Sequence, residues 1–240
     1  MKIENLEPNL IILSAYGQII PKEILKIPKY GCLNIHPSLL PKYRGPSPIQ
    51  TAILNGDEKT GVTIFIMDEK IDHGPIVAQK ELEIKNYNFK TLSKKLANLG
   101  ADLLIEILPK YLAGEMKPIP QDDSKATYTK IIKKEDGKIN WQKSAEEIER
   151  MTRAFTLWPG TYTYINLKKP KMLKIIKVKV FKIDHQKTPG TIFLTEKKEL
   201  AVACAQNALI LKEVQLEGKR KMSGRDFLNG HPEIINSILS

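Results

Sequence analysis

The sequence predicts an α/β domain followed by a small β-barrel domain. In the first half, short apolar runs typical of strands buried on both faces alternate with segments of helical period. In the second half, one helical segment precedes several short segments of strand character at close spacing, which is typical of a small barrel. Between them, residues 115–137 are polar and contain two prolines. We therefore expect a first domain at residues 1–117, a linker at 118–137 and a second domain at 138–240.

The first domain is expected to mix strands with helices. The expected strands are the apolar runs at residues 10–14, 31–35, 61–67 and 76–84. Two short helices are expected where proline stands at a first helical turn, at residues 21–25 and 48–54. A longer helix is expected because apolar side chains recur at steps of three or four and share one face, namely Leu92, Leu96, Leu99, Leu103 and Ile107. Thr91 is its expected N-cap, and Ala113-Gly114 its expected end.

The second domain is expected to begin with a helix. Ser144-Ala145-Glu146-Glu147 is a capping-box pattern, and Trp158-Pro159-Gly160 would end the helix. Segments with strand chemistry follow at residues 161–165, 173–183, 191–195, 200–204 and 208–214, and residues 223–228 are expected to close the domain as a helical turn.

Composition excludes several classes of protein. A hydrophobic fraction of 42% excludes global disorder. No apolar stretch approaches the ~20 residues of a membrane helix, and the first ten residues lack the apolar core of a signal peptide. Cys32 and Cys204 cannot supply a disulfide framework or a four-cysteine zinc site. We therefore expect a soluble protein of the cytoplasm.

The net charge of +11 is concentrated in the second half of the chain. Residues 1–120 hold 15 basic and 13 acidic residues, whereas residues 121–240 hold 23 and 14. This asymmetry indicates an anionic partner for the second half, or a general use of lysine on solvated surfaces, and charge alone favours neither.

Asn34 and His36 are candidate catalytic residues at the end of an expected strand. Side chains alternate along a strand, so both point to one face, and Pro37 ends the strand there. An imidazole with a pKa near neutrality can act as a general acid or base, and an amide N–H can stabilise an oxyanion. The alternative is a strand-end histidine with an asparagine that caps the turn.

Residues 67–75 form an acidic loop between two expected strands. A carboxylate of this loop that faced His36 would orient the ring and raise its pKa. The alternative is a solvated acidic hairpin with Gly-Pro turn chemistry. The spacing leaves open whether Asp72 meets His36.

These segments resemble the folate-dependent formyltransferase family. The resemblance is carried by Asn34-Ile35-His36-Pro37-Ser38-Leu39-Leu40-Pro41, by Arg44-Gly45 and by Ile71-Asp72-x-Gly74. Residues 15–21, 44–50, 61–64, 153–155, 158–160 and 222–228 are similar in particular to the members that act on methionyl-tRNA. The resemblance runs across essentially the whole chain.

The resemblance implies a Rossmann-like formyltransferase domain followed by an OB-like barrel. It implies formyl transfer from 10-formyltetrahydrofolate to the α-amine of methionyl-initiator tRNA, without a metal. Asn34 and His36 would stabilise and protonate the tetrahedral intermediate, and Asp72 would hold and polarise His36. The segment that would line the folate pocket consists of Ser38, Leu39, Leu40 and Pro41.

The resemblance also implies that the barrel contacts tRNA, which agrees with its surplus of charge. The candidate tRNA-binding lysines are Lys168, Lys169, Lys171 and Lys174. Contacts to phosphates would make binding salt-sensitive. Such lysines can equally be solvated residues that guard a strand edge. A monomer is expected for the full-length protein.

The sequence departs from the family at its start, because only nine residues precede the strand at residues 10–14. We therefore expect an N-terminally incomplete catalytic domain, with a longer start upstream of Met1. Two alternatives stay open: a formyltransferase for a small amine such as a sugar nucleotide or purine ribonucleotide, and a non-catalytic remnant that binds tRNA or folate. His73 is expected to lie on the surface of its loop.

Overall fold

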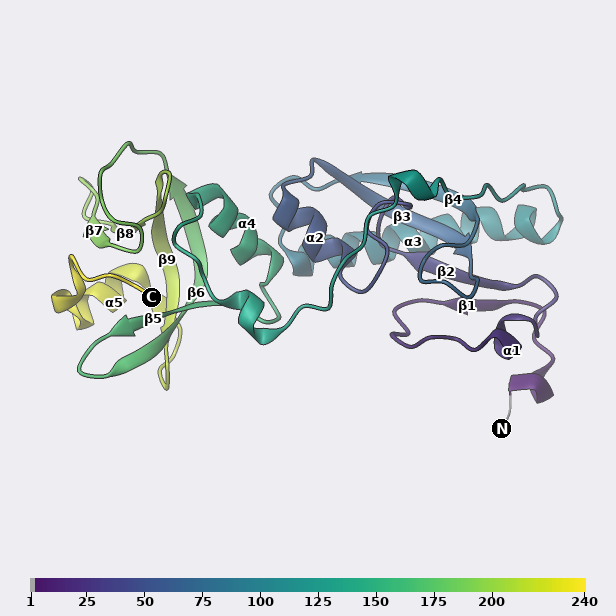
Figure 1. The fold of residues 1–240 in the computed structure, drawn as a ribbon, viewed down its shortest axis with the longest axis horizontal. Coiled ribbons are helices and arrows are strands. Elements are labelled where there is room, and N and C mark those ends of the chain that lie inside the picture. The colour runs from purple at the N-terminus through teal and green to yellow at the C-terminus, as the bar shows by residue number, and fades with distance from the viewer. Residues whose placement is uncertain (1–2) are drawn as a thin grey trace. The chain divides into compact units, whose positions relative to one another are not determined.

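The computed structural model describes residues 3–240 and divides the chain into two compact units, Met1–Ile131 and Ile132–Ser240 (Figure 1). Residues 118–131, expected to belong to a linker, therefore group with the first unit. Short 3₁₀ helices lie at Ile3–Leu6, Asp123–Lys125, Lys134–Gly137 and Pro232–Ile234. None of the helices in the described residues is long and apolar enough to span a bilayer.

The first unit is built on a four-stranded sheet in the order β1-β2-β3-β4. The strands are β1 (Ile11–Leu13), β2 (Cys32–His36), β3 (Lys59–Ile66) and β4 (Ile76–Glu83), and the helices are α1 (Lys22–Leu25), α2 (Pro48–Asn55) and α3 (Phe89–Leu112). β1 and β2 pair in parallel, whereas β2, β3 and β4 pair antiparallel. The strands and helices expected from the sequence are confirmed to within a few residues at their ends.

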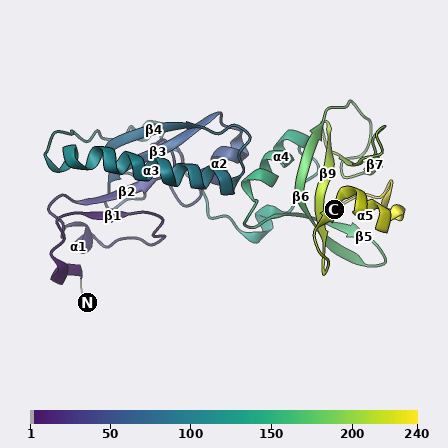
Figure 2. The same cartoon turned by 180° about the vertical axis from the view of Figure 1, so that it is seen from behind.

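Helix α3 packs along the sheet (Figure 2). Its buried face includes Leu92, Leu96 and Leu103, as the periodicity predicts. The predicted N-cap was wrong: Asn88 caps the helix, and its Oδ1 accepts a hydrogen bond of 3.0 Å from the N–H of Thr91. Both residues have capping side chains three positions apart, so the local pattern alone did not separate them.

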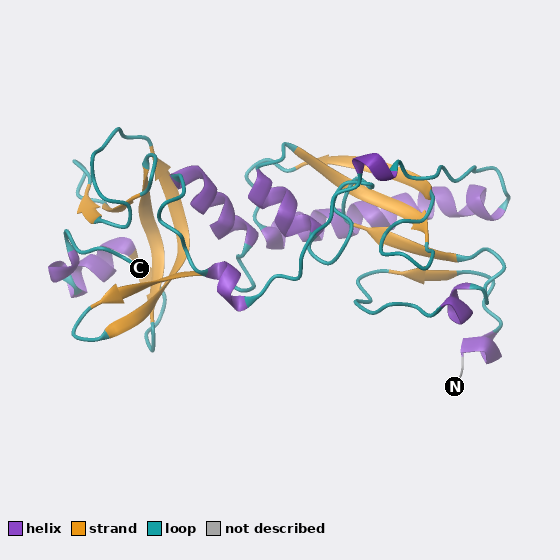
Figure 3. Ribbon diagram, in the orientation of Figure 1, coloured by secondary structure: helices purple, strands orange, loops and turns teal. Residues whose placement is uncertain are grey.

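The second unit has a curled sheet with two helices, α4 (Ala145–Ala154) and α5 (Gly224–Gly230) (Figure 3). The sheet order is β5-β6-β9-β8-β7, and β10 pairs with β9. The strands are β5 (Thr161–Asn166), β6 (Pro170–Phe181), β7 (Ile192–Leu194), β8 (Leu200–Ala203), β9 (Ala208–Leu216) and β10 (Met222–Ser223). The capping box of α4 is confirmed, because Ser144 and Glu147 each bond the other's backbone N–H.

The last residues of the chain connect the two ends of this curled sheet. Ser240 exchanges backbone hydrogen bonds of 2.8 and 3.1 Å with Tyr164 in β5. On its other side, the segment bonds to the beginning of β7, where the N–H of Ile192 donates to Ser237 and the N–H of Leu239 donates to Gly190. The segment therefore fills the position between β5 and β7, which gives the unit its barrel character.

Candidate functional site

Strand β2 presents Asn34 and His36 on the face turned away from α3. Leu33 packs with the α3 side chains of a buried cluster. Ile35 also faces the helix, because a Cβ built on Gly100 would lie 2.7 Å from its Cγ2 atom. Since side chains alternate along a strand, Asn34 and His36 project together from the opposite face.

The imidazole of His36 is buried, with 5% of its surface exposed, and both ring nitrogens face oxygen atoms. Its Nε2 lies 2.9 Å from the carbonyl oxygen of Tyr43, and its Nδ1 lies 3.6 Å from Oδ2 of Asp72. A carbonyl oxygen can only accept a hydrogen bond, so Nε2 carries a hydrogen and donates a hydrogen bond to the Tyr43 carbonyl oxygen. In the neutral ring, Nδ1 is then the nitrogen that can accept a proton.

Burial decides the pKa of His36. The loss of solvation lowers this pKa, and the opposing effects of the Asp72 charge and the Tyr43 carbonyl do not fully compensate. The ring is therefore neutral near pH 7, and a proton taken up at Nδ1 would be stabilised by the Asp72 carboxylate.

Asp72 lies in the loop between β3 and β4, with a left-handed φ of 48°. Its Oδ2 accepts a hydrogen bond of 2.7 Å from the N–H of Gly45. Two residues further on, a Cβ on Gly74 would lie 1.8 Å from the carbonyl oxygen of Ile66, so the spacing Asp72-x-Gly74 has a steric reason. The structure thus brings Asp72 to His36 across 36 residues of chain.

Within the described residues, the side-chain amide of Asn34 makes no hydrogen bond to the rest of the protein. Asn34 is half-buried, so its donors can reach a ligand on the His36 face of β2.

The loop after β2 holds the predicted folate-lining residues. Ser38 and Leu40 are buried, and their backbone groups bond to Thr63 of β3. The Ser38 hydroxyl donates to the carbonyl of Lys42 at 2.6 Å. Leu39 and Pro41 are half-buried, and they are the members of this segment with surface to offer a ligand.

Comparison with known proteins identifies the chain. The model of the formyl transferase family matches residues 1–108, and that of the formyl transferase C-terminal domain matches residues 131–232. The methionyl-tRNA formyltransferase of Caldanaerobacter subterraneus subsp. tengcongensis is 45% identical over 231 residues, which cover 96% of this chain and 74% of the relative. That of Caldicellulosiruptor saccharolyticus is 45% identical over 241 residues, 99% of this chain and 76% of the relative.

The chain belongs to the methionyl-tRNA formyltransferase family. The resemblance inferred from the sequence motifs is therefore confirmed, together with the fold class and the assignment as an enzyme.

Solved structures agree with the formyltransferase fold. The chain is similar to HypX from Aquifex aeolicus, solved in complex with tetrahydrofolic acid, with a TM-score of 0.68 and a sequence identity of 19%. The match covers 95% of this chain and 40% of the HypX chain. It is also similar to an N-formyltransferase from Helicobacter canadensis, solved in complex with folinic acid and dTDP-3-aminofucose, with a TM-score of 0.68 and a sequence identity of 22%. This match covers 92% of this chain and 78% of the Helicobacter chain.

Arg44 belongs to the formyltransferase motif, and its role becomes apparent only in the structure. It is 1% exposed, and its guanidinium donates to side-chain oxygens of Gln121, Asp123 and Tyr128. These partners lie more than 75 residues away in the chain, so no local signal could have indicated them.

His73 is held by two carboxylates of the formyltransferase unit. Its Nδ1 lies 2.5 Å from Oδ2 of Asp68, and its Nε2 lies 3.3 Å from Oδ2 of Asp123. Its side chain is 28% exposed. Each ring nitrogen of His73 thus has a carboxylate partner, Asp68 at Nδ1 and Asp123 at Nε2. Across the described residues, no group of three or more histidine, cysteine or acidic side chains could hold a metal ion.

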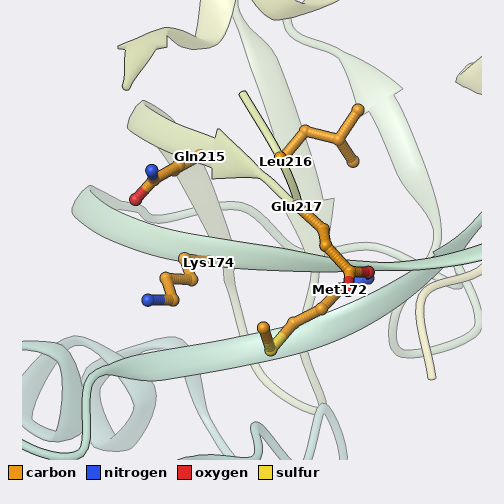
Figure 4. Close-up of a pocket in the computed structure, with 6 residues that line it drawn as sticks. Met172, Lys174, Gln215, Leu216 and Glu217 are labelled. Carbon is orange, nitrogen blue, oxygen red and sulfur yellow. The ribbon is translucent and has the colours of Figure 1, made fainter. Parts of the chain in front are cut away.

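The four candidate tRNA-binding lysines are exposed, on β6 or on the turn that precedes it. Lys174 lies opposite Tyr162 of β5 and Gln215 of β9. It lines a shallow pocket of about 140 Å³ with Met172, Gln215 and Glu217 (Figure 4). This volume is below the roughly 300 Å³ of a typical small-molecule site, and Glu217 adds a negative charge, so the pocket is a poor candidate for a folate site.

Proposed function

We propose that the chain transfers a formyl group from 10-formyltetrahydrofolate to the α-amine of methionyl-initiator tRNA. The observation that carries this proposal is the identity of 45% with methionyl-tRNA formyltransferases over nearly the whole chain. The juxtaposition of Asn34, His36 and Asp72 supports it, because acyl transfer to an amine needs an oxyanion stabiliser and a group that moves a proton.

In this proposal, two side chains of β2 act at the formyl carbon: Asn34 stabilises the oxyanion, and His36 transfers the proton. The amine nitrogen of the aminoacyl end forms a bond to this carbon, and the amide of Asn34 donates to the oxygen that becomes negative. Nδ1 of His36 accepts the proton that the attacking nitrogen loses. It then returns this proton to the departing folate nitrogen as the bond between that nitrogen and the formyl carbon breaks, so the ring ends neutral.

Asp72 stabilises the transient imidazolium. Its Oδ2, 3.6 Å from Nδ1, supplies the opposite charge while the ring is protonated. The hydrogen bond from Nε2 to Tyr43 keeps the ring in one orientation during both proton transfers. Ser38, Leu39, Leu40 and Pro41 line the folate side of the site, with Leu39 and Pro41 in direct contact.

The second domain contributes tRNA binding in this proposal, through lysines that include Lys168, Lys169, Lys171 and Lys174. The segment 118–137 joins it to the catalytic domain 1–117. The support is the positive charge of the second half and the exposure of these side chains. We further infer a monomer that acts in the cytoplasm.

Formylation of charged initiator tRNA by the purified chain tests the proposal. His36→Ala is expected to lower kcat by about 10²- to 10⁴-fold, the usual contribution of a general acid–base group. His231→Ala, the same exchange at a half-buried histidine of the second unit, is the matched control and is expected to keep the wild-type kcat.

Two results would contradict the proposal. Transfer to sugar or purine amines in preference to charged tRNA would favour the small-amine alternative. Folate binding without turnover by the wild-type chain would favour the non-catalytic alternative.

A further inference from the structure

Residues 119–130 form a strap that is hydrogen-bonded along the first unit. Ile119 exchanges two backbone hydrogen bonds of 2.8 Å with Ile76 at the beginning of β4. Near its other end, the strap brackets Arg44: the N–H of Arg44 donates to Thr127, and the N–H of Thr129 donates to Arg44, both at 2.8 Å. The strap is therefore fixed to the unit that contains His36 and Asp72.

Gln121 connects the strap to the Asp72 loop through its amide N–H groups and to Arg44 through its amide oxygen. Its Nε2 donates to the carbonyl oxygens of Asp72 and Gly74, each at 2.9 Å. Its Oε1 accepts from Nε and Nη2 of Arg44, at 3.1 and 2.8 Å. Turning the amide over would set donors against donors and acceptors against acceptors, so the network fixes its orientation.

Arg44 connects the same network to the carboxylate of Asp72. Its neighbour Gly45 donates the hydrogen bond of 2.7 Å that Oδ2 of Asp72 accepts. A Cβ on Gly45 would lie 3.0 Å from both oxygens of Thr129, so Gly45 sits tightly against the strap. The backbone of Asp72 is thus held through Gln121, and its carboxylate through the residue next to Arg44.

Asp72 needs such support because its backbone is in an unfavourable conformation. A φ of 48° lies in the left-handed region, which residues with a side chain rarely adopt, and such a residue stays there when its surroundings impose the conformation. A loop released from Gln121 could relax, and the carboxylate would leave its position opposite Nδ1 of His36.

We propose that Gln121 and Arg44 are positioning residues that hold the Asp72 carboxylate against His36. The catalytic consequence rests on the proposed function, whereas the effect on His36 does not.

Gln121→Glu separates the two functions of this side chain. A carboxylate still accepts from Arg44, but it has no N–H to donate to the carbonyls of Asp72 and Gly74. The kcat for formylation is expected to fall about 10- to 100-fold, because a catalytic group misplaced by about 1 Å loses activity on this scale. KM for both substrates is expected to stay unchanged. Arg44→Lys is expected to act in the same direction, because one ammonium group cannot replace a guanidinium fork.

A substrate-free readout is the titration of His36, followed by NMR of histidine-labelled protein. The charge of Asp72 raises the pKa of His36. Asp72→Asn is therefore expected to lower this pKa, and by more than any variant of Gln121. Gln121→Met, which lacks the N–H donors and adds no charge, is expected to lower it in the same direction. The matched control is Asp122→Asn on the strap, because Asp122 caps Ser124 and is expected to leave kcat and the titration unchanged.

The outcomes separate this inference from the proposed function. A folded Gln121→Glu protein with wild-type kcat, together with a wild-type His36 titration in Gln121→Met, would overturn the inference. If Gln121→Glu does not fold, Gln121→Met decides by both readouts. A lowered His36 pKa in a chain whose wild type does not formylate tRNA would support the inference and refute the proposed function.

Discussion

Oδ2 of Asp72 lies 3.6 Å from Nδ1 of His36, and the same oxygen accepts a hydrogen bond of 2.7 Å from the backbone of Gly45. The carboxylate is thus anchored by the backbone and faces the nitrogen that can accept a proton.

Asp72→Asn is expected to lower kcat by about 100-fold or more, because the protonated ring loses its counter-charge while the neutral ring is little affected. The measurement is the pH profile of kcat. The His36 pKa falls without Asp72, so the acidic limb of the profile is expected to move to lower pH. An unchanged kcat would contradict the role of Asp72.

Burial of His36 is expected to make stability depend on pH. The folded-state pKa lies below the ordinary value of 6.5, so the unfolded state binds more protons in this range. Stability is therefore complete above pH ~6.5 and is lost as the pH falls towards the folded-state pKa. Thermal melts between pH 5 and 7 are expected to show this loss in wild type and a smaller one in His36→Gln. Equal slopes would contradict the assignment.

Gly74→Ala is expected to destabilise the protein by about 1–3 kcal/mol, the usual cost of overpacking. The added methyl group would lie 1.8 Å from the Ile66 carbonyl oxygen and would displace the Asp72 loop. Denaturant melts measure the effect. Gly230→Ala is the control, because a Cβ there meets nothing within 4 Å and is expected to cause no loss. A fully stable Gly74→Ala protein would refute the tight approach.

The double variant Lys168→Gln with Lys169→Gln is expected to weaken tRNA binding and its dependence on salt. Each lost phosphate contact reduces the slope of log K against log salt by about 0.7–0.9. Titrations at several salt concentrations measure this slope. Lys212→Gln serves as control, because Lys212 is paired with Glu199 at 2.5 Å. An unchanged slope would mean that these lysines are only solvated.

Most helices and strands were predicted from the sequence because they are determined by residues that are close to one another in the chain. The capping box at Ser144 and the apolar face of α3 each depend on residues within a few positions, and both appear in the structure. The prediction of Thr91 as the cap of α3 is wrong because Asn88, three residues earlier, offers the same capping chemistry. Residues 118–131 read as a linker because they lack a period, yet they hydrogen-bond to the first unit as the strap.

The sequence by itself determined the family, the order of the elements and the face of β2 that carries Asn34 and His36, because motif identity and strand alternation are properties of neighbouring residues. Only the tertiary structure decided how the site is assembled. β3 is antiparallel to β2, so its end at Ile66 pairs with Leu33, away from His36, and the loop must fold back to deliver Asp72. That return depends on Gln121 of the strap, and contacts between such distant residues are set by packing and leave no pattern in the sequence.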